Sequence, residues 1–290
     1  MKKLISAAII ALFVTQGAAR AADLEVQVFN PGAASIFPTS ASLISGPTEV
    51  LLVDAEFQKN DAEALVQMIK DSGKTLKTIY ISYADPDAYF GLDVITAAFP
   101  EAKVLATSTT VRDIKQTVEG KLAYWGPILG ENAPAKTVMP EVIEGDTMTV
   151  DGELVKIIGL DGHDPVHTYL WIPSVKTVLG GVILEESEHV WIADSQTPES
   201  RQNWQKTLDS MVALSPARVI PTHFVGKSTE GMDSVTFTRD YLLAFEEEAA
   251  KAADSTALIA AMTARYPGLA SEMSLEISAK VIKGEMKWPQ

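Results

Sequence analysis

The sequence contains no cysteine among its 290 residues. Disulfide bonds and thiolate metal ligands are therefore excluded, and any metal site must be built from His, Asp, Glu and water. Histidine is almost as scarce, because the chain has only four: His163, His167, His189 and His223. Any imidazole chemistry in this protein must use one of these four residues.

Long apolar runs are confined to the N-terminus. Lys2 and Lys3 precede an apolar stretch that ends at Val14, and small residues follow up to Ala21. This pattern is typical of a secretory signal peptide, and the apolar stretch is too short to cross a bilayer comfortably as a permanent anchor. We expect residues 1–21 to be removed, which predicts an exported protein, periplasmic or secreted.

Positive charge is scarce as well. The chain has 24 Lys and Arg against 38 Asp and Glu, for a net charge of −14, and loss of the signal peptide would make it more negative. Such a surface repels nucleic-acid phosphates and anionic membranes, so no nucleic-acid partner is expected. No later segment has about 18 uninterrupted apolar residues, and no Gly-, Ser- or Pro-rich linker divides the chain. Residues 22–290 are therefore expected to form a single domain without a membrane span.

The segments from residue 48 to residue 107 alternate between strand and helix patterns. Compact apolar runs predict strands, and Leu65, Met68 and Ile69 recur on one face of a helix between the first two. Strands that alternate with helices indicate an α/β layer architecture. The predicted strands are residues 48–56, 76–82 and 103–107, and the predicted helices are residues 60–73 and the segment around Leu92, Ile95 and Phe99.

The second half of the chain mixes a loop, hairpins and helices. Residues 120–140 carry several Gly and Pro and show no clear period, which predicts a long loop over the surface. Asp151-Gly152 and a later Pro-Ser pair are turn signals between strand-like runs, so antiparallel strands should make the sheet mixed. Thr197 is a predicted helix cap. A last short strand is expected at residues 217–224, before the C-terminal helices.

Two of the histidines stand at places that favour a site. His223 ends the predicted strand ARVIPTHF, where a parallel-type strand delivers residues to a crevice. His163 opens the loop GHDPVH, although a histidine there commonly bonds to the backbone. His167 can satisfy a neighbouring carbonyl, and His189 lies beside Trp191, where it would form a pocket wall or partner a nearby glutamate.

The stretch ISYADPDAYFG, residues 81–91, carries two aspartates where a strand ends. On these residues alone a turn is sufficient, because Asp87 can cap a helix that starts at Ala88 and Asp85-Pro86 can form the turn before it. The place of this stretch before three later motifs supports a second interpretation, that of a metal-binding loop.

Four motifs in order resemble the metallo-β-lactamase fold superfamily over residues 39–224. They are ISYADPDAYFG, where the family has HxHxDH; the Gly-His loop GHDPVHTYLWI; TVLGGVIL, where a Gly-Asp pair closes a strand; and VIPTHF, where Pro-Gly-His usually stands. The resemblance implies an α/β fold, a four-layer αββα sandwich with mixed sheets and a metal site at the sheet edges. It also implies a hydrolase that acts on a small lactone, ester or amide.

The departures from the family pattern concern the metal ligands. Tyr83 and Ala88 stand where the family has its first and last histidines, and Gly181 stands where it has a bridging aspartate. The positions that keep a metal-binding residue type, according to the resemblance, are Asp85, Asp87, His163 and His223.

This set of ligands does not support the usual dinuclear zinc site, because a catalytic zinc ion typically holds three protein ligands and a water. Asp85 with His163 would form one half-site and Asp87 with His223 the other. Each half-site therefore has two protein ligands, not the three that a catalytic zinc ion requires. The four side chains together favour one weakly held divalent ion, Zn²⁺, Mn²⁺ or Fe²⁺, or none.

Three functions are consistent with this pattern. The first is a hydrolase with an atypical mononuclear site, and the second is a non-catalytic relative that binds a small molecule or partner in the same crevice. The third is metal-free acid–base chemistry by an Asp–His pair, which has less support because no activated Ser or Cys nucleophile is apparent.

Two further groups complete the predicted site. Asp87 and Tyr83 are catalytic candidates, since a phenol in the crevice can donate to a developing oxyanion, although Tyr83 can equally fill the volume of an absent metal and imidazole. The predicted substrate pocket is lined by Tyr124, Trp125, His189 and Trp191.

Overall fold

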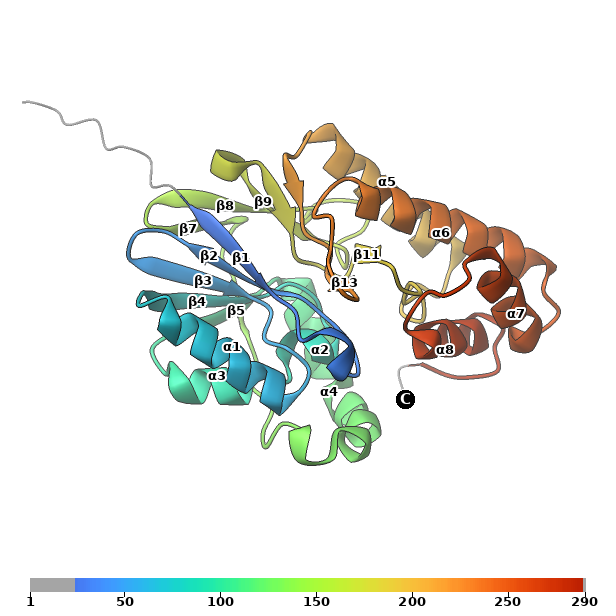
Figure 1. Cartoon of the computed structure of the whole chain (residues 1–290), viewed down its shortest axis with the longest axis horizontal. Coiled ribbons are helices and arrows are strands. Elements are labelled where there is room, and N and C mark those ends of the chain that lie inside the picture. The colour runs from blue at the N-terminus through green and yellow to red at the C-terminus, as the bar shows by residue number, and fades with distance from the viewer. Residues whose placement is uncertain (1–23, 289–290) are drawn as a thin grey trace, which may run out of the picture.

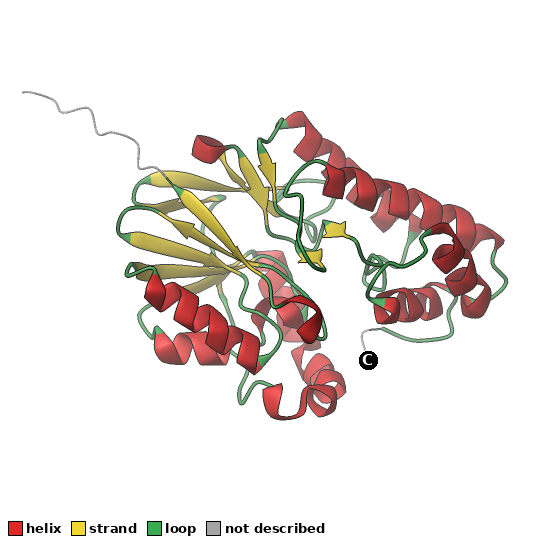
Figure 2. Ribbon diagram, in the orientation of Figure 1, coloured by secondary structure: helices red, strands yellow, loops and turns green. Residues whose placement is uncertain are grey.

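The protein folds into two β-sheets that pack face to face between two layers of helices (Figure 1, Figure 2). This computed structural model describes residues 24–288, so the predicted signal peptide, residues 1–21, lies outside the described residues. The predicted four-layer α/β sandwich with mixed sheets is confirmed. Within residues 24–288, no helix has the length and apolar composition needed to cross a membrane.

The first sheet has six strands in the order β1-β2-β3-β4-β5-β6. The first three pair antiparallel, whereas β3 to β6 run parallel. Parallel strands place their carboxyl ends at one edge of the sheet, which is where the candidate site lies. The bounds are β1 Glu25–Phe29, β2 Ala41–Ser45, β3 Glu49–Val53, β4 Thr75–Ile81, β5 Lys103–Ala106 and β6 Glu141–Val142.

The second sheet has five strands in the order β12-β10-β9-β8-β7. The predicted turn at Asp151-Gly152 is confirmed, because both residues have the positive φ (47° and 87°) that a tight two-residue hairpin turn requires. A separate parallel pair, β11 with β13, lies at the site. The bounds are β7 Thr147–Val150, β8 Glu153–Ile158, β9 Tyr169–Ile172, β10 Thr177–Leu179, β11 Glu185–Glu186, β12 Arg218–Val219 and β13 His223–Phe224.

The helices form the two outer layers. Apolar side chains of α1, α3 and α4 pack with the first sheet, and those of α5 and α6 pack with the second. α7 packs on α6 and α8 packs on α7, and α8 contributes apolar side chains to both clusters. The bounds are α1 Lys59–Asp71, α2 Pro86–Tyr89, α3 Leu92–Ala98, α4 Ser108–Leu129, α5 Pro198–Ala213, α6 Asp233–Lys251, α7 Ser255–Arg265 and α8 Glu272–Ile282. Three short 3₁₀ turns occur at η1 Gly32–Ala34, η2 Gly130–Asn132 and η3 Pro173–Val175.

The apolar run of β3 explains why the sheets stack. Val50 and Leu52 face the helices of the first layer, whereas Leu51 and Val53 face the second sheet. Successive side chains of a strand point to opposite faces, so a continuous apolar run can be buried on both. The prediction of a strand here is confirmed, and it ends just before Asp54.

The predicted loop over residues 120–140 is wrong in its first half, because α4 continues to Leu129. Lys121, Trp125 and Leu129 are buried at a spacing of four, which is one face of a helix. Because that face includes a lysine and Gly and Pro lie nearby, the apolar residues of this segment show no clear helical period in the sequence. Pro127 lies in the last turn, where the helix ends two residues later.

Candidate functional site

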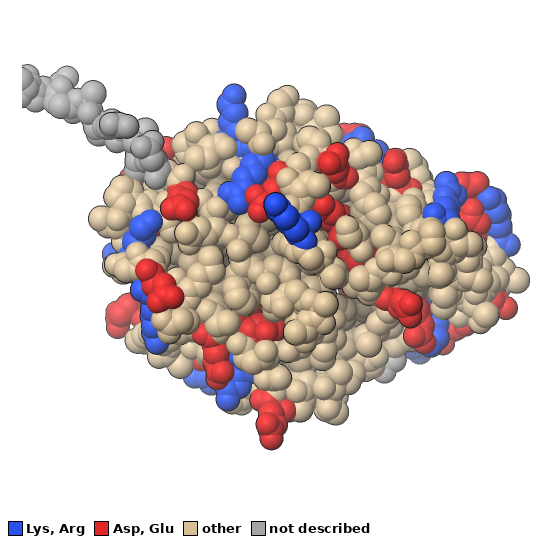
Figure 3. All heavy atoms as spheres, viewed as in Figure 1, with Lys and Arg blue, Asp and Glu red and all other residues tan. Residues whose placement is uncertain are grey.

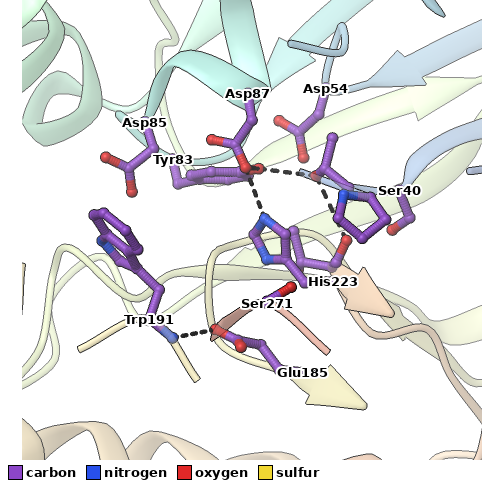
Figure 4. A network of polar contacts seen from close by, with 12 residues as sticks. Ser40, Asp54, Tyr83, Asp85, Asp87, Glu185, Trp191, His223 and Ser271 are labelled. Carbon is purple, nitrogen blue, oxygen red and sulfur yellow. Dashed lines mark hydrogen bonds and ion pairs between the residues drawn. The ribbon is translucent and has the colours of Figure 1, made fainter. Parts of the chain in front are cut away.

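The site forms where the segment after β4 meets β13. Tyr83, Asp85 and Asp87 follow the end of β4, and Pro86 occupies the first turn of α2, where its fixed φ is favourable. His223 comes from β13 and pairs in register with Glu185 of β11. Figure 4 shows the side chains of Tyr83, Asp87 and His223 pointing toward one another.

Asp87 is the centre of a buried hydrogen-bond network. His223 Nε2 donates to Asp87 Oδ2 at 2.7 Å, and the Tyr83 hydroxyl donates to the same oxygen at 3.0 Å. Thr39 Oγ1 lies 3.1 Å from the Tyr83 hydroxyl. Among the described residues, no group is hydrogen-bonded to Nδ1 of His223. The imidazole is therefore fixed on one side and has an unused nitrogen on the other.

The surrounding carboxylates set the charge of His223. Burial alone lowers the pKa of this imidazole, but Asp87 outweighs it and, with help from Glu185 and Glu188, raises the pKa to about 10. His223 is therefore an imidazolium at neutral pH. Both of its ring nitrogens carry a proton, and the Nδ1 proton has no acceptor in the described part of the protein.

Asp85 has a different cation as its partner. Lys121 Nζ of α4 donates to Asp85 Oδ1 and, at 3.3 Å, to the carbonyl oxygen of Ala84. Burial and the nearby Asp194 raise the pKa of Asp85 to about 6, although Lys121 opposes this. Burial lowers the pKa of Lys121, and Asp85 and Asp194 outweigh that effect and raise it. The pair is therefore charged at neutral pH.

Two acidic residues lie behind the site in left-handed backbone conformations, Asp54 with φ 64° and Glu56 with φ 73°. Asp54 accepts hydrogen bonds from the backbone N–H (2.8 Å) and hydroxyl (2.6 Å) of Ser82, yet burial raises its pKa to about 7. Both carboxyl oxygens of Glu56 are buried without a described partner, and burial raises its pKa well above the usual range.

A narrow cavity opens beside Asp87 and His223. Its aromatic lining consists of Phe37, Phe57, Trp125, Trp191 and Trp288. Its ionisable lining consists of Asp85, Asp87, Glu185, Glu188 and His223. Trp125 and Trp191 were predicted from the sequence. Glu185 and Glu188 were not predicted as site residues, although both lie close to Trp191 in ESEHVWIAD.

In both Glu185 and Glu188, a hydrogen bond fixes one of the two carboxyl oxygens. The backbone N–H of Trp191 donates to Glu185 Oε1 at 2.9 Å, as Figure 4 shows. The Ser271 hydroxyl donates to Glu188 Oε2, and Glu188 Oε1 has no described partner. Burial raises the pKa of both carboxyls, to about 8 for Glu185, while His223 opposes the shift.

The other predicted pocket residues lie outside this cavity lining. Tyr124 packs its ring against Trp125 and Trp288, with centroids 4.8 and 5.6 Å away. His189 Nδ1 shares a 2.8 Å hydrogen bond with the hydroxyl of Tyr241 in the second helix layer, and burial lowers its pKa. Both are packing residues in this structure.

His163 does not join Asp85, so the predicted Asp85–His163 half-site is not formed. His163 is exposed, and its Nε2 donates at 3.1 Å to the backbone oxygen of Asn203 in α5. The buried histidine of the same loop is His167, which donates to Asp164 at 2.8 Å and stacks on Trp204. The four predicted ligands are therefore divided, and only Asp87 and His223 meet.

Comparison with known proteins identifies the family. The protein-family model described as "Metallo-beta-lactamase superfamily" matches residues 35–223 of the chain. The chain belongs to the metallo-β-lactamase superfamily. Among curated proteins, the Beta-lactamase-like protein 2 homolog of Caenorhabditis elegans is 24% identical over 210 residues, a match that covers 70% of this chain. The chain spans 62% of the length of that relative.

Solved structures agree on the fold. A metallo-beta-lactamase from Pontibacter korlensis superposes with a TM-score of 0.55 at 15% identity, over 76% of this chain and 99% of that one. The DIM-1 metallo-beta-lactamase superposes with a TM-score of 0.54 at 19% identity, over 77% of this chain and 97% of that one. At these identities the similarity establishes the architecture alone.

Metallo-β-lactamase superfamily members usually bind divalent metal ions, but the side chains of this site do not fit such a centre. Within residues 24–288, no group of three or more His, Cys, Asp or Glu is placed to hold a metal ion. Asp85 and Asp87 are each paired with a side-chain cation, Lys121 and His223. The charge of each aspartate is therefore already neutralised, and too few other ligands lie nearby to complete a metal site.

The position of the bridging aspartate is closed as well. Gly181 has a φ of +77°, and a Cβ atom there would lie 2.2 Å from the carbonyl oxygen of Thr168. The Thr222 hydroxyl donates to the carbonyl oxygen of Gly181, and the hydroxyl of Ser82 accepts from its N–H at 2.7 Å. This backbone leaves no room for a bridging carboxylate.

Proposed function

We propose that this protein is an exported hydrolase of a small carbonyl compound, a lactone, ester or amide, and that it works by general base catalysis at Glu185 with His223, held by Asp87, as the donor to the oxyanion. The observation that carries the proposal is the orientation of His223, a residue of the cavity lining, whose Nε2 is fixed by Asp87 while its buried Nδ1 has no described partner. A fixed cationic donor stabilises the negative charge that develops on a carbonyl oxygen during attack.

His223 acts as the electrophile in this mechanism. Its imidazolium Nδ1–H donates to the substrate carbonyl oxygen, and the charge of Asp87 keeps the ring protonated. Tyr83 is 1% exposed, and burial raises its pKa well above the usual range. Its hydroxyl donates to Asp87, so Tyr83 positions the carboxylate and does not itself act as an acid.

Glu185 is the proposed general base. The backbone N–H of Trp191 holds Oε1, which leaves Oε2 to accept a proton from a water molecule. The water oxygen attacks the carbonyl carbon as its proton passes to Glu185, and the oxyanion is stabilised by His223. Collapse of the tetrahedral intermediate breaks the bond to the leaving group, which takes the proton back from Glu185.

The test is hydrolysis of a panel of lactones, esters and amides by the mature protein, followed by mass spectrometry of the products. Asp87→Asn is the matched variant, because it keeps the side-chain volume and removes the charge that holds His223 protonated. We expect hydrolysis of at least one class and a loss of about 100-fold or more in the variant. Equal rates in both proteins, or no hydrolysis of any class by folded protein, would contradict the proposal.

A further inference from the structure

We propose that the cavity recognises an organic cation, so that the substrate carries a quaternary or alkylated ammonium group. That this cation is a substrate rests on the proposed function. That the cavity binds such a cation does not depend on the proposed function. The inference comes from the combination of aromatic and acidic side chains that line one cavity.

The aromatic wall is built from five rings that segments far apart in the sequence bring together. Phe37 and Trp125 meet edge to face with centroids 5.2 Å apart, and Trp191 and Trp288 meet at 5.4 Å. Phe57 contacts Trp125 at 5.6 Å. The face of an aromatic ring carries negative charge and attracts ammonium groups, most strongly when water is excluded.

The acidic wall points to a cation more directly. Four carboxyl groups line the cavity, and the side chains that line it include no Lys or Arg in the described part of the chain. Lys121 and His223 balance two of the four, Asp85 and Asp87. Glu185 and Glu188 are left without a Lys or Arg partner within residues 24–288.

Among the carboxyl groups that line the cavity, Glu188 has a buried oxygen without a described partner. Its side chain is 2% exposed, Ser271 holds one carboxyl oxygen, and the other has no described hydrogen bond. A buried carboxylate without a Lys or Arg partner is unfavourable, and a cation that enters the cavity would relieve this cost. We assign Glu188 as the charge that the ligand neutralises.

The preference for a cation comes from the cavity, with long-range help from the acidic chain. On the face in Figure 3, acidic and basic side chains are mixed, and no large patch of one sign marks that surface. The net charge of −14 still favours the approach of cations. A metal ion is a poorer fit, because no group of three or more His, Cys, Asp or Glu in residues 24–288 is placed to hold one.

The test compares choline with 3,3-dimethylbutan-1-ol, which has the same shape but carbon in place of the charged nitrogen. Binding to the mature protein is measured by calorimetry and by quenching of tryptophan fluorescence. We expect choline to bind at least about tenfold more tightly than the neutral alcohol. Equal affinities, or no binding of either at millimolar concentration, would overturn the inference.

Two variants locate the effect. Glu188→Gln should reduce the preference for choline to less than about threefold, because it removes the unpaired charge. Glu186→Gln is the matched control, since Glu186 accepts hydrogen bonds from Ser228 and Thr229 and does not line the cavity. A preference that survives in Glu188→Gln, or disappears in both folded variants, would contradict the assignment of Glu188.

The outcome separates this inference from the proposed function. Choline selectivity without hydrolysis of any carbonyl compound would support the cation site and overturn the hydrolase. Hydrolysis of neutral esters without choline selectivity would support the hydrolase and overturn the cation site.

Discussion

His223 and Asp87 are 136 residues apart in sequence and share a 2.7 Å hydrogen bond between the imidazole Nε2 and carboxylate Oδ2 atoms. This pair occupies one half of the metal site that the family pattern implies. Lys121 and Asp85 form the equivalent pair in the other half. Each aspartate that the sequence pattern assigned to a metal ion thus has a side-chain cation as its partner.

The first prediction contrasts two histidines. His223→Gln should lower kcat/KM for a hydrolysed substrate by about 10²- to 10⁴-fold, because it removes the cationic donor. His163→Gln should stay within about twofold, since His163 is exposed and bonds only to a backbone oxygen of α5. Steady-state kinetics with circular dichroism as a folding control measures both. Similar large losses in the two variants would indicate a metal site that uses His163.

The second prediction concerns the pH dependence of hydrolysis. The pKa of Glu185 is raised to about 8, so the rate should rise as pH increases toward that value and the base loses its proton. The pKa of His223 is raised to about 10, so the rate should fall above that value. The pH profile of kcat/KM checks this, and Glu185→Gln should remove the lower limb. A profile already flat between about pH 6 and 8 would exclude Glu185 as the base.

The third prediction tests the buried ion pair of Lys121 and Asp85. Lys121→Met should lower the free energy of unfolding by roughly 3–5 kcal/mol, because it leaves a buried carboxylate without its cation. The double variant Lys121→Met, Asp85→Asn should recover part of this loss. Urea denaturation measures each value, with Lys77→Met as an exposed-lysine control that changes stability by about 0.5 kcal/mol or less. A double variant no more stable than the single one would contradict the pairing.

The fourth prediction is that the protein is more stable in mild acid than in mild alkali. The pKa of Asp54 rises from 3.8 in the unfolded chain to about 7 in the folded one, so the folded state binds more protons between these values. Stability from this group is therefore present below about pH 4 and is lost as pH rises through 7. His223 acts in the same direction, because its pKa rises from 6.5 to about 10.

Asp54→Asn separates the contribution of Asp54 from that of the whole molecule. The variant should show a shallower fall in unfolding free energy between about pH 5 and pH 8 than the unchanged protein, because it has no proton to lose. Denaturation midpoints at several pH values measure the slope. A steeper fall in the variant, or stability that increases with pH in the unchanged protein, would contradict the prediction.

Local periodicity predicted the α/β class and several elements well, since it reports which faces are buried, whereas the four-layer arrangement came from the resemblance to the family. The runs that became β3, β4 and β5 and the helix α1 were located within a few residues. α4 was not predicted, and its second half was wrongly predicted as a loop, because its buried face includes Lys121, whose burial depends on Asp85, 36 residues earlier. Local pattern cannot reveal a pairing of that kind.

The site was only partly predictable for the same reason. Motif order indicated Asp87 and His223, and the structure brings them together. It equally indicated His163, which lies in a loop whose buried histidine is His167. Glu188 carries no local signal, since its significance comes from the aromatic rings that tertiary packing places around it.

The metal content of the purified protein tests the central claim most directly. Two side-chain cations already neutralise Asp85 and Asp87, so protein prepared without chelator and dialysed against zinc-containing buffer should retain fewer than one tightly bound transition metal ion per chain. Elemental analysis gives this number without knowledge of the substrate. Two zinc ions per chain would contradict the account.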